Sequence, residues 1–210
     1  MKDVTHIVPS MGENGGGPPR SVGQLCDRLV DTHSVHLVTA SDPEDPLVHL
    51  DPRIKTHLVE GENRTILGRF KASGFGETLQ ALHATHGISA CHQHGIWLRC
   101  SHETSTFASQ NSIPLIMAPR GMLEPWAINN SKWKKKLAWF LYQKRDLQRV
   151  TAFHATAQSE AESIRRLGFK QPIAVIPNGV QLPEAIGCED GKVKIHNSGV
   201  RTAMNYRLRI

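Results

Sequence analysis

Short apolar runs alternate along this chain with longer segments whose apolar residues recur at helical spacing. The predicted strands cover residues 4–8, 35–39, 54–59, 88–94, 114–118, 152–156 and 173–176. One predicted helix begins at residue 21, and the others cover residues 78–86, 101–110, 132–149 and 159–167. Strands that alternate with helices need crossover connections, which favour a mostly parallel sheet with helices on both faces. We therefore expect a doubly wound, Rossmann-like α/β fold.

Ligands of doubly wound sheets bind outside the carboxyl ends of the strands, so the segments after the strands are the candidates for a site. After the first strand comes Gly15-Gly-Gly-Pro-Pro-Arg20 and then a helix. Glycines let backbone N–H groups approach an anion, and the partial positive charge of a helix N-terminus favours one there. The spacing fits neither a P-loop nor a dinucleotide fingerprint. A turn without a ligand is the alternative.

His92-Gln-His94 ends the fourth strand and leads into Gly95-Ile-Trp97. A histidine there can hydrogen-bond to a substrate hydroxyl or exchange a proton near neutral pH. His92 and His94 would share one face of the strand. Three interpretations remain open: a ligand-binding His94, a structural histidine, or a metal site that draws on the nearby Cys91, Cys100 and His102.

The segment after the fifth strand contains Arg120 and Glu124 between prolines. An arginine fork suits phosphate groups and sugar hydroxyls, so the pair could clamp a polar substrate. An ion pair that braces the loop is the alternative.

The positive charge of the chain is confined to one segment. The whole sequence has 25 Lys and Arg against 19 Asp and Glu, a net charge of +6. Residues 132–149 hold seven of the basic residues and one acid, so the remainder is neutral. A positive charge confined to one segment is not typical of a protein that coats nucleic acid.

The same segment predicts one long amphipathic helix. Its expected buried face comprises Trp133, Leu137, Phe140, Leu141 and Leu147. A core-packed helix with a solvated cationic side is one interpretation. A surface helix whose lysines attract anionic lipid or a phosphorylated acceptor is the other. The lysines of this patch are Lys132, Lys134, Lys135 and Lys136.

The remaining composition is that of a globular protein, with 39% hydrophobic and 21% charged residues. No apolar run approaches the ~18 residues that a membrane-spanning helix needs, and the first residues do not resemble a signal peptide. The four cysteines are far apart and form no Cys-x-x-Cys pair, which favours neither disulfides nor a zinc ribbon. We expect a cytoplasmic monomer, in peripheral contact with the inner face of a membrane if the lysine patch binds lipid.

Taken in order, these segments resemble the N-terminal, acceptor-side half of family four glycosyltransferases, which are retaining enzymes of the two-domain GT-B fold. The matching segments are Gly16-Gly-Pro-Pro-Arg-Ser-Val22, His94-Gly-Ile-Trp97, Pro119-Arg-Gly-Met-Leu-Glu-Pro-Trp126, Lys134-Lys-Lys-Leu-Ala-Trp139, Phe153-His-Ala-Thr-Ala-Gln-Ser-Glu160 and Ile176-Pro-Asn-Gly-Val180. The resemblance spans about residues 4–183. Such enzymes move a sugar from a nucleotide-sugar to an acceptor, often lipid-linked or polysaccharide, and need no metal or other cofactor.

The resemblance also implies roles for individual residues. His94 would be the catalytic-site residue that contacts the transferred sugar. The donor would lie against Gly16 and Gly17, with Asn178 and Gly179 at the approach to the interdomain linker. The acceptor side would contain Arg20, Arg120 and Glu124.

The sequence departs from the family after residue 183. The family has a second domain there, which binds the nucleotide and carries a Glu-x7-Glu pair. We expect residues 1–183 to form the acceptor domain and residues 184–210 to be a linker and the start of a second domain, with a strand beginning near residue 201. A chain without the donor domain should be inactive alone and bind nucleotide-sugar weakly. Two alternatives remain: a stand-alone acceptor- or membrane-binding module, and a metal-dependent hydrolase built on Cys91, His92, His94 and His102.

Overall fold

The computed structural model describes residues 3–60, 74–130, 132–179, 186–189 and 192–195. The strands are β1 (Asp3–Ser10), β2 (Ser34–Ser41), β3 (Lys55–Glu60), β4 (Ala90–His94), β5 (Leu115–Ala118), β6 (Ala152–Ala155), β7 (Ile173–Val175), β8 (Ile186–Glu189) and β9 (Lys192–Ile195). The helices are η1 (Glu13–Gly15), α1 (Gly17–Leu29), α3 (Phe75–His86), α4 (Arg99–Gln110), α5 (Pro125–Asn129), α6 (Lys132–Ala138), η2 (Trp139–Gln143), α7 (Lys144–Gln148) and α8 (Gln158–Arg166).

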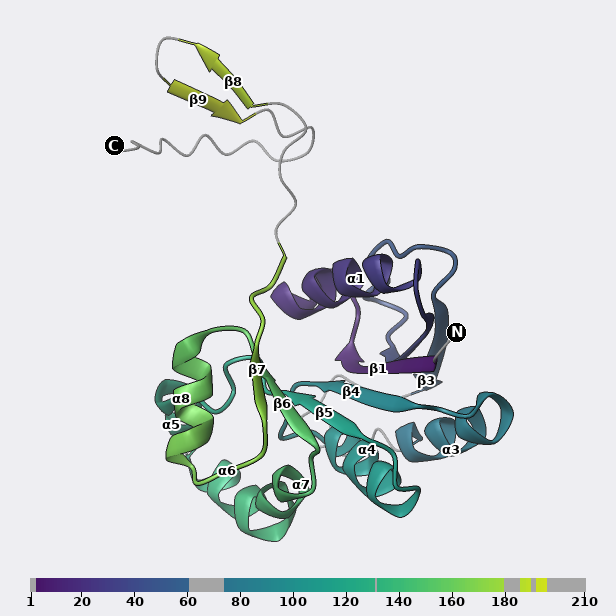
Figure 1. Cartoon of the computed structure of the whole chain (residues 1–210), viewed down its shortest axis with the longest axis vertical. Coiled ribbons are helices and arrows are strands. Elements are labelled where there is room, and N and C mark those ends of the chain that lie inside the picture. Colours follow the sequence, from purple (N-terminus) through teal and green to yellow (C-terminus); the bar gives the residue numbers. More distant parts are fainter. Residues whose placement is uncertain (1–2, 61–73, 131, 180–185, 190–191, 196–210) are drawn as a thin grey trace. The chain divides into compact units, whose positions relative to one another are not determined.

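The strands β1 to β7 form one sheet in the order β3-β2-β1-β4-β5-β6-β7, and every neighbouring pair is parallel (Figure 1). The predicted doubly wound, Rossmann-like fold is therefore confirmed. Each of these strands overlaps a predicted one, because runs of buried apolar residues mark strands covered on both faces. The order reverses between β1 and β4, which makes their carboxyl ends the topological switch point.

Two layers of helix pack on the sheet, with α1 on one side and α3 and α4 on the other (Figure 1). Successive side chains of a strand point to opposite faces of the sheet, so the buried residues form two hydrophobic cores, one on each face. Val8 of β1 packs in the core beneath α1, whereas its neighbour Ile7 belongs to the larger core that contains Leu79 of α3 and Phe107 of α4. The helices consequently run back from the carboxyl edge of the sheet, and their N-termini lie near that edge.

Glycine and proline set two helix boundaries that position the site. Gly16 precedes α1 with φ 77°, a conformation that glycine adopts without strain. Pro18 and Pro19 occupy the first turn, where a missing N–H costs little and a fixed φ suits the helix. α3 ends at Gly87, whose φ of 69° gives the left-handed C-cap common at helix ends.

The long amphipathic helix predicted over residues 132–149 is helical, but the buried face was predicted wrongly. The segment is divided into α6, the π-helix η2 and α7. Trp133 is 70% exposed, Phe140 74% and Leu141 65%. The side chains that are buried in their place include Gln143 and Asp146, together with the correctly predicted Leu147.

Specific polar partners explain this reversal. The Gln143 Oε1 atom accepts a hydrogen bond of 2.7 Å from the backbone N–H of Trp97. Asp146 Oδ2 lies 2.8 Å from His102 Nδ1. Buried polar groups are stable where they are hydrogen-bonded, and these two bonds turn an apolar stripe toward solvent.

Residues Met1–Asn178 form one compact unit and Gly179–Ile210 a second. Within the second unit, β8 and β9 pair as an antiparallel hairpin. The predicted boundary after residue 183 stays a prediction. The strand predicted near residue 201 lies outside the described residues.

Candidate functional site

The predicted site residues gather at the carboxyl ends of the central strands. β1 ends at Ser10, β4 at His94 and β5 at Ala118. The segments that follow carry the glycine loop, Gly95 and Arg120. Because β1 and β4 flank the switch point, the crevice of a doubly wound sheet opens at this edge.

His94 is almost fully buried, and both of its ring nitrogens are hydrogen-bonded. Arg120 Nη2 donates to His94 Nδ1 over 3.0 Å. His94 Nε2 lies 3.0 Å from Nδ1 of His6 on the neighbouring strand. A guanidinium only donates, so Nδ1 of His94 is the acceptor, and the proton of a neutral ring sits on Nε2 and points to His6. The network assigns this tautomer, and His94 must exchange a partner to contact a ligand.

A second pair of histidines continues the cluster. His154 Nε2 lies 3.0 Å from the carbonyl oxygen of Ile176, so it is the donor and leaves Nδ1 as an acceptor. His92 Nε2 lies 3.2 Å from that Nδ1. This contact crosses β5, where Ile116 is opposite His92 and Ala118 is opposite His94. As predicted, His92 and His94 share a face, and their ring centres are 4.2 Å apart.

Burial keeps these rings neutral. It lowers the pKa of His6 from 6.5 to about 4, with a smaller contribution from the charge of Arg120. Burial also lowers the pKa of His92 and His94 well below 6.5, and neighbouring histidines and Arg120 add to the effect. A ring whose pKa lies well below 6.5 is not an imidazolium at neutral pH, so His94 acts here as a neutral hydrogen-bonding group.

Arg120 links the sheet edge to the end of the first unit. Its φ of 57° lies in the left-handed region, which is uncommon for a residue with a side chain. Nη1 donates to Asn178 Oδ1 while Nη2 holds His94. Arg120 Nε is buried and has no hydrogen-bond partner among the described residues. The guanidinium therefore keeps one donor without a partner among the described residues.

Glu160 holds the backbone around Arg120. One carboxylate oxygen accepts the Gly121 N–H over 2.6 Å, and the other accepts the Thr156 N–H over 2.7 Å and its hydroxyl over 3.0 Å. The side chain is 2% exposed. Its charge also opposes the lowering of the Arg120 pKa, which comes from burial. Glu160 thus fixes the loop that presents the guanidinium.

The glycine loop leaves its helix start open. A Cβ added at Gly16 or Gly17 would meet no atom within 4 Å. Pro18 and Pro19 carry no N–H, so Gly16 and Gly17 supply the donors nearest to the start of α1. Arg20 is exposed on the first turn of that helix.

A pocket of about 400 Å³ lies beside this loop. Its lining includes Ser10, Asn14, Gly15 and Asp45. Asp45 Oδ1 accepts the backbone N–H and the side-chain amide of Asn14, each over 3.0 Å, and so ties the loop to the segment after β2. The pocket is therefore built on a braced loop.

Glu124 lies at the start of α5 and accepts a hydrogen bond of 2.9 Å from Ser163 Oγ of α8. It does not bond to Arg120, which is held by His94 and Asn178. The acceptor-side role of Glu124 stays a prediction. Gly179 begins the second unit, and its donor-side role stays a prediction too.

The lysine patch is divided in the structure. Lys135 Nζ donates to the carbonyl oxygen of Ala127 and lies 5.8 Å from the ring centre of Trp97. Lys136 is exposed. The side chains of Lys132 and Lys134 lie outside the described residues.

The predicted metal set of Cys91, His92, His94 and His102 does not assemble. Cys91 faces the core on the opposite side of β4, and burial raises the pKa of its thiol to about 12. His102 is hydrogen-bonded to Asp146. These two findings correct the proposed hydrolase site.

The group of described residues that could hold a metal ion is His6, His92 and His94, whose ring nitrogens lie within 4.8 Å of one another. An ion there would have to break the His6–His94 hydrogen bond. It would also meet the positive charge of Arg120, whose Nη2 is 3.0 Å from His94 Nδ1. The hydrogen-bond network therefore disfavours a cation in this cluster.

Sequence reasoning missed His6, His154 and Glu160. The available signal was a polar residue inside an apolar strand, since histidine within a buried strand needs a partner. Glu160 had no such signal, because an acidic residue in the first turn of a helix is ordinary.

A family model described as a glycosyl transferase 4-like domain matches residues 16–179. No curated protein sequence matches the chain. No helix among the described residues is long and apolar enough to cross a membrane.

Solved structures share the fold. Sucrose-phosphate synthase from Thermosynechococcus elongatus has a TM-score of 0.64 at 19% identity, over 84% of this chain and 48% of that one. HepE of Anabaena, in complex with UDP and glucose, has a TM-score of 0.56 at 12% identity, over 86% of this chain and 45% of HepE. UDP-GlcNAc 2-epimerase from Methanocaldococcus jannaschii has a TM-score of 0.55 at 10% identity, over 84% and 45%. The chain thus spans about half the length of these proteins.

Proposed function

The chain belongs to the glycosyl transferase 4-like family, and on that premise we propose that it forms the acceptor-side half of a sugar-transferring enzyme. The donor is a nucleotide-sugar, and the acceptor is a saccharide or a lipid-linked saccharide. The observation that carries this proposal is the Arg120 guanidinium. It is held between His94 and Asn178 at the carboxyl edge of the sheet, with a buried Nε that has no partner among the described residues.

This arrangement suits positioning and charge stabilisation. Arg120 offers a positive charge and a free donor to a phosphate oxygen or a sugar hydroxyl. We infer that a hydroxyl of the transferred sugar replaces Arg120 on His94 Nδ1, which accepts because the ring is neutral. Gly16 and Gly17 lie against the diphosphate. Orientation and a fixed charge of this kind are the means by which a site without an acid–base group lowers a barrier.

Saturation-transfer NMR with UDP-glucose, UDP-GlcNAc and GDP-mannose tests the donor site, because it detects weak binding. We expect enhancement on the sugar ring protons of one donor and loss of most of it in Arg120→Gln. Arg149→Gln is the matched control, since Arg149 is exposed at the end of α7. Equal enhancement in Arg120→Gln and wild type, or no enhancement with any donor, contradicts the proposal.

We propose further that residues 1–183 act as the acceptor domain and that the 210-residue chain does not turn over alone. The support is that it spans about half the length of the structures with which it shares a fold. An assay of nucleoside diphosphate release in the presence of saccharide acceptors measures this. Release above the rate without protein would show that the chain is competent.

A second candidate function, binding to an anionic membrane surface, is favoured by the apolar face that the structure exposes. Trp126 is 71% exposed and lies on α5, and Trp133, Phe140 and Leu141 follow on α6 and η2. The neighbouring Lys136 is exposed as well. Aromatic side chains beside lysines suit the interface of an anionic bilayer, where the apolar groups enter and the cations remain at the headgroups. The enzyme would then work peripherally on a lipid-linked acceptor.

Co-sedimentation with vesicles tests this candidate. We expect binding to phosphatidylcholine vesicles that contain phosphatidylglycerol, weaker binding at higher salt, and loss of binding in Phe140→Ser/Leu141→Ser. Leu58→Ser is the control, because Leu58 is an exposed apolar residue on β3. Binding that ignores salt, or that survives in the double variant, excludes this surface.

A further inference from the structure

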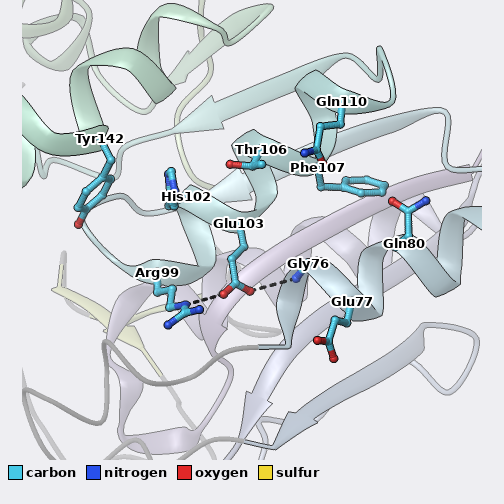
Figure 2. Close-up of a pocket in the computed structure, with 10 residues that line it drawn as sticks. All are labelled: Gly76, Glu77, Gln80, Arg99, His102, Glu103, Thr106, Phe107, Gln110 and Tyr142. Carbon is cyan, nitrogen blue, oxygen red and sulfur yellow. Dashed lines mark hydrogen bonds and ion pairs between the residues drawn. The ribbon is translucent and has the colours of Figure 1, made fainter.

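A second pocket, of about 680 Å³, lies between α3 and α4, with Tyr142 of η2 at one end of its lining (Figure 2). None of its lining residues belongs to the histidine and arginine cluster at the sheet edge. Its volume is within the range of about 300–1,000 Å³ that small-molecule sites occupy.

One face of α4 forms the floor of this pocket. The lining residues of α4 are Arg99, His102, Glu103, Thr106, Phe107 and Gln110, which recur at three- and four-residue spacing. Gly76, Glu77 and Gln80 of α3 line the opposite wall. Because the helices run back from the carboxyl edge, the pocket is a groove that begins near that edge. α4 has 12 residues and is therefore about 18 Å long.

Two of the charged groups that line the groove, Arg99 and Glu103, are paired with each other, and the exposed Glu77 of α3 adds a second carboxylate. Glu103 accepts from Arg99 Nε over 2.7 Å and from the backbone N–H of Gly76 over 3.1 Å (Figure 2). His102 Nδ1 is 2.8 Å from the buried carboxylate of Asp146, which leaves Nε2 of the half-exposed ring for another partner. An additional anion would therefore meet two carboxylates, Glu77 and Glu103, while the lining cation Arg99 is already bonded to Glu103.

Neutral polar groups and ring faces make up the rest. Gln80 and Gln110 contribute carboxamides and Thr106 a hydroxyl. Tyr142 contributes an aromatic face at one end of the pocket (Figure 2), whereas Phe107 is only 3% exposed and belongs to the hydrophobic core. Tyr142 is fixed, because its hydroxyl donates to the Trp97 carbonyl over 2.9 Å. Carboxamides and a hydroxyl can each donate and accept a hydrogen bond. Together with the Tyr142 ring they match a ligand that has hydroxyls on its rim and apolar ring faces.

We propose that the groove between α3 and α4 binds a neutral saccharide chain, outside the sugar-transfer site. Its hydroxyls bond to His102 Nε2, Thr106 and the two carboxamides, and a ring face packs on Tyr142. Saccharide binding in this groove does not depend on the proposed function. The further step, that the bound chain is the acceptor and extends from the sheet edge along α4, rests on the proposed function.

Titration of the full chain with maltohexaose, cellohexaose and laminarihexaose, followed by 1H–15N NMR, tests the binding. We expect at least one of them to shift the amides of Gly76, Thr106 and Gln110. Thr106→Trp fills the groove and should weaken the affinity by about tenfold or more, as should Gln110→Ala through a lost hydrogen bond. Ser109→Ala is the matched control, because Ser109 is exposed on the same helix and does not line the groove.

The proposal is overturned if none of the three saccharides binds, if Thr106→Trp binds as well as wild type, or if the shifts centre on His94. Saturation transfer with UDP-glucose, UDP-GlcNAc and GDP-mannose on the same samples reports on the other site. If no donor binds while a saccharide does, the proposed function is contradicted and the groove proposal stands. If a donor binds and no saccharide does, only the groove proposal is contradicted.

Discussion

At the scale of single residues, this protein holds a strained arginine, Arg120, between hydrogen-bond acceptors. The left-handed backbone of Arg120 costs on the order of 1–3 kcal/mol and persists only where surrounding bonds hold it. His94 and Asn178 hold the guanidinium, and Glu160 holds the following backbone N–H of Gly121. The position of the Arg120 guanidinium therefore depends on Glu160, which lies outside the site.

We predict that Glu160→Gln destabilises the fold by about 1–3 kcal/mol, because one of the two acceptor oxygens becomes a donor facing another donor. Chemical denaturation measures the free energy of unfolding. Glu162→Gln is the control, an exposed glutamate on the same helix, and should change that energy by less than about 0.5 kcal/mol. Equal effects of the two substitutions would show that the Glu160 bonds contribute nothing.

At the scale of elements, the segment α6–η2–α7 buries polar side chains and exposes apolar ones. A hydrophobic stripe normally turns inward. Here the Gln143 side chain accepts the backbone N–H of Trp97, a residue with φ 73°. Asp146 accepts a hydrogen bond from His102. The π-helix at Trp139–Gln143 is the kind of local insertion that often accompanies functional sites.

We predict that Gln143→Leu lowers stability although it restores an apolar residue to the core. The Trp97 N–H would lose its acceptor, at a cost of about 1–3 kcal/mol. Removal of Gln143 Nε2, which has no partner among the described residues, offsets part of this cost. Gln148→Leu, at an exposed position of α7, is the control. Thermal unfolding should show a lower Tm for the first variant, and a higher one would mean that packing outweighs the bond.

At the scale of the whole molecule, buried neutral histidines couple stability to pH. Burial is the largest cause of a lowered pKa in each of His6, His36, His57, His92, His94 and His154. For His6 and His36 the value falls from 6.5 to about 4. Such a histidine takes up a proton on unfolding, so acid favours the unfolded state.

We predict that the free energy of unfolding is level above pH 6.5 and falls as the pH drops from 6.5 toward about 4. Each buried histidine contributes up to about 1.4 kcal/mol per pH unit in that window. Urea titrations at half-unit pH steps measure the slope. A stability curve that is flat between pH 6.5 and pH 4.5 would contradict the prediction.

The sequence by itself determined the strands, their parallel arrangement and the segments that follow them. Apolar runs and helical spacing are local, and parallel strands bring their carboxyl ends to one edge, so His94 and Arg120 could be expected together. Only the tertiary structure decided the partners. His6 meets His94 across 88 positions of sequence, and Gln143 meets Trp97 across 46. Which face of a helix is buried, and which nitrogen of a ring is free, depends on such distant hydrogen bonds, because the cost of an unpaired buried polar group outweighs a local apolar pattern.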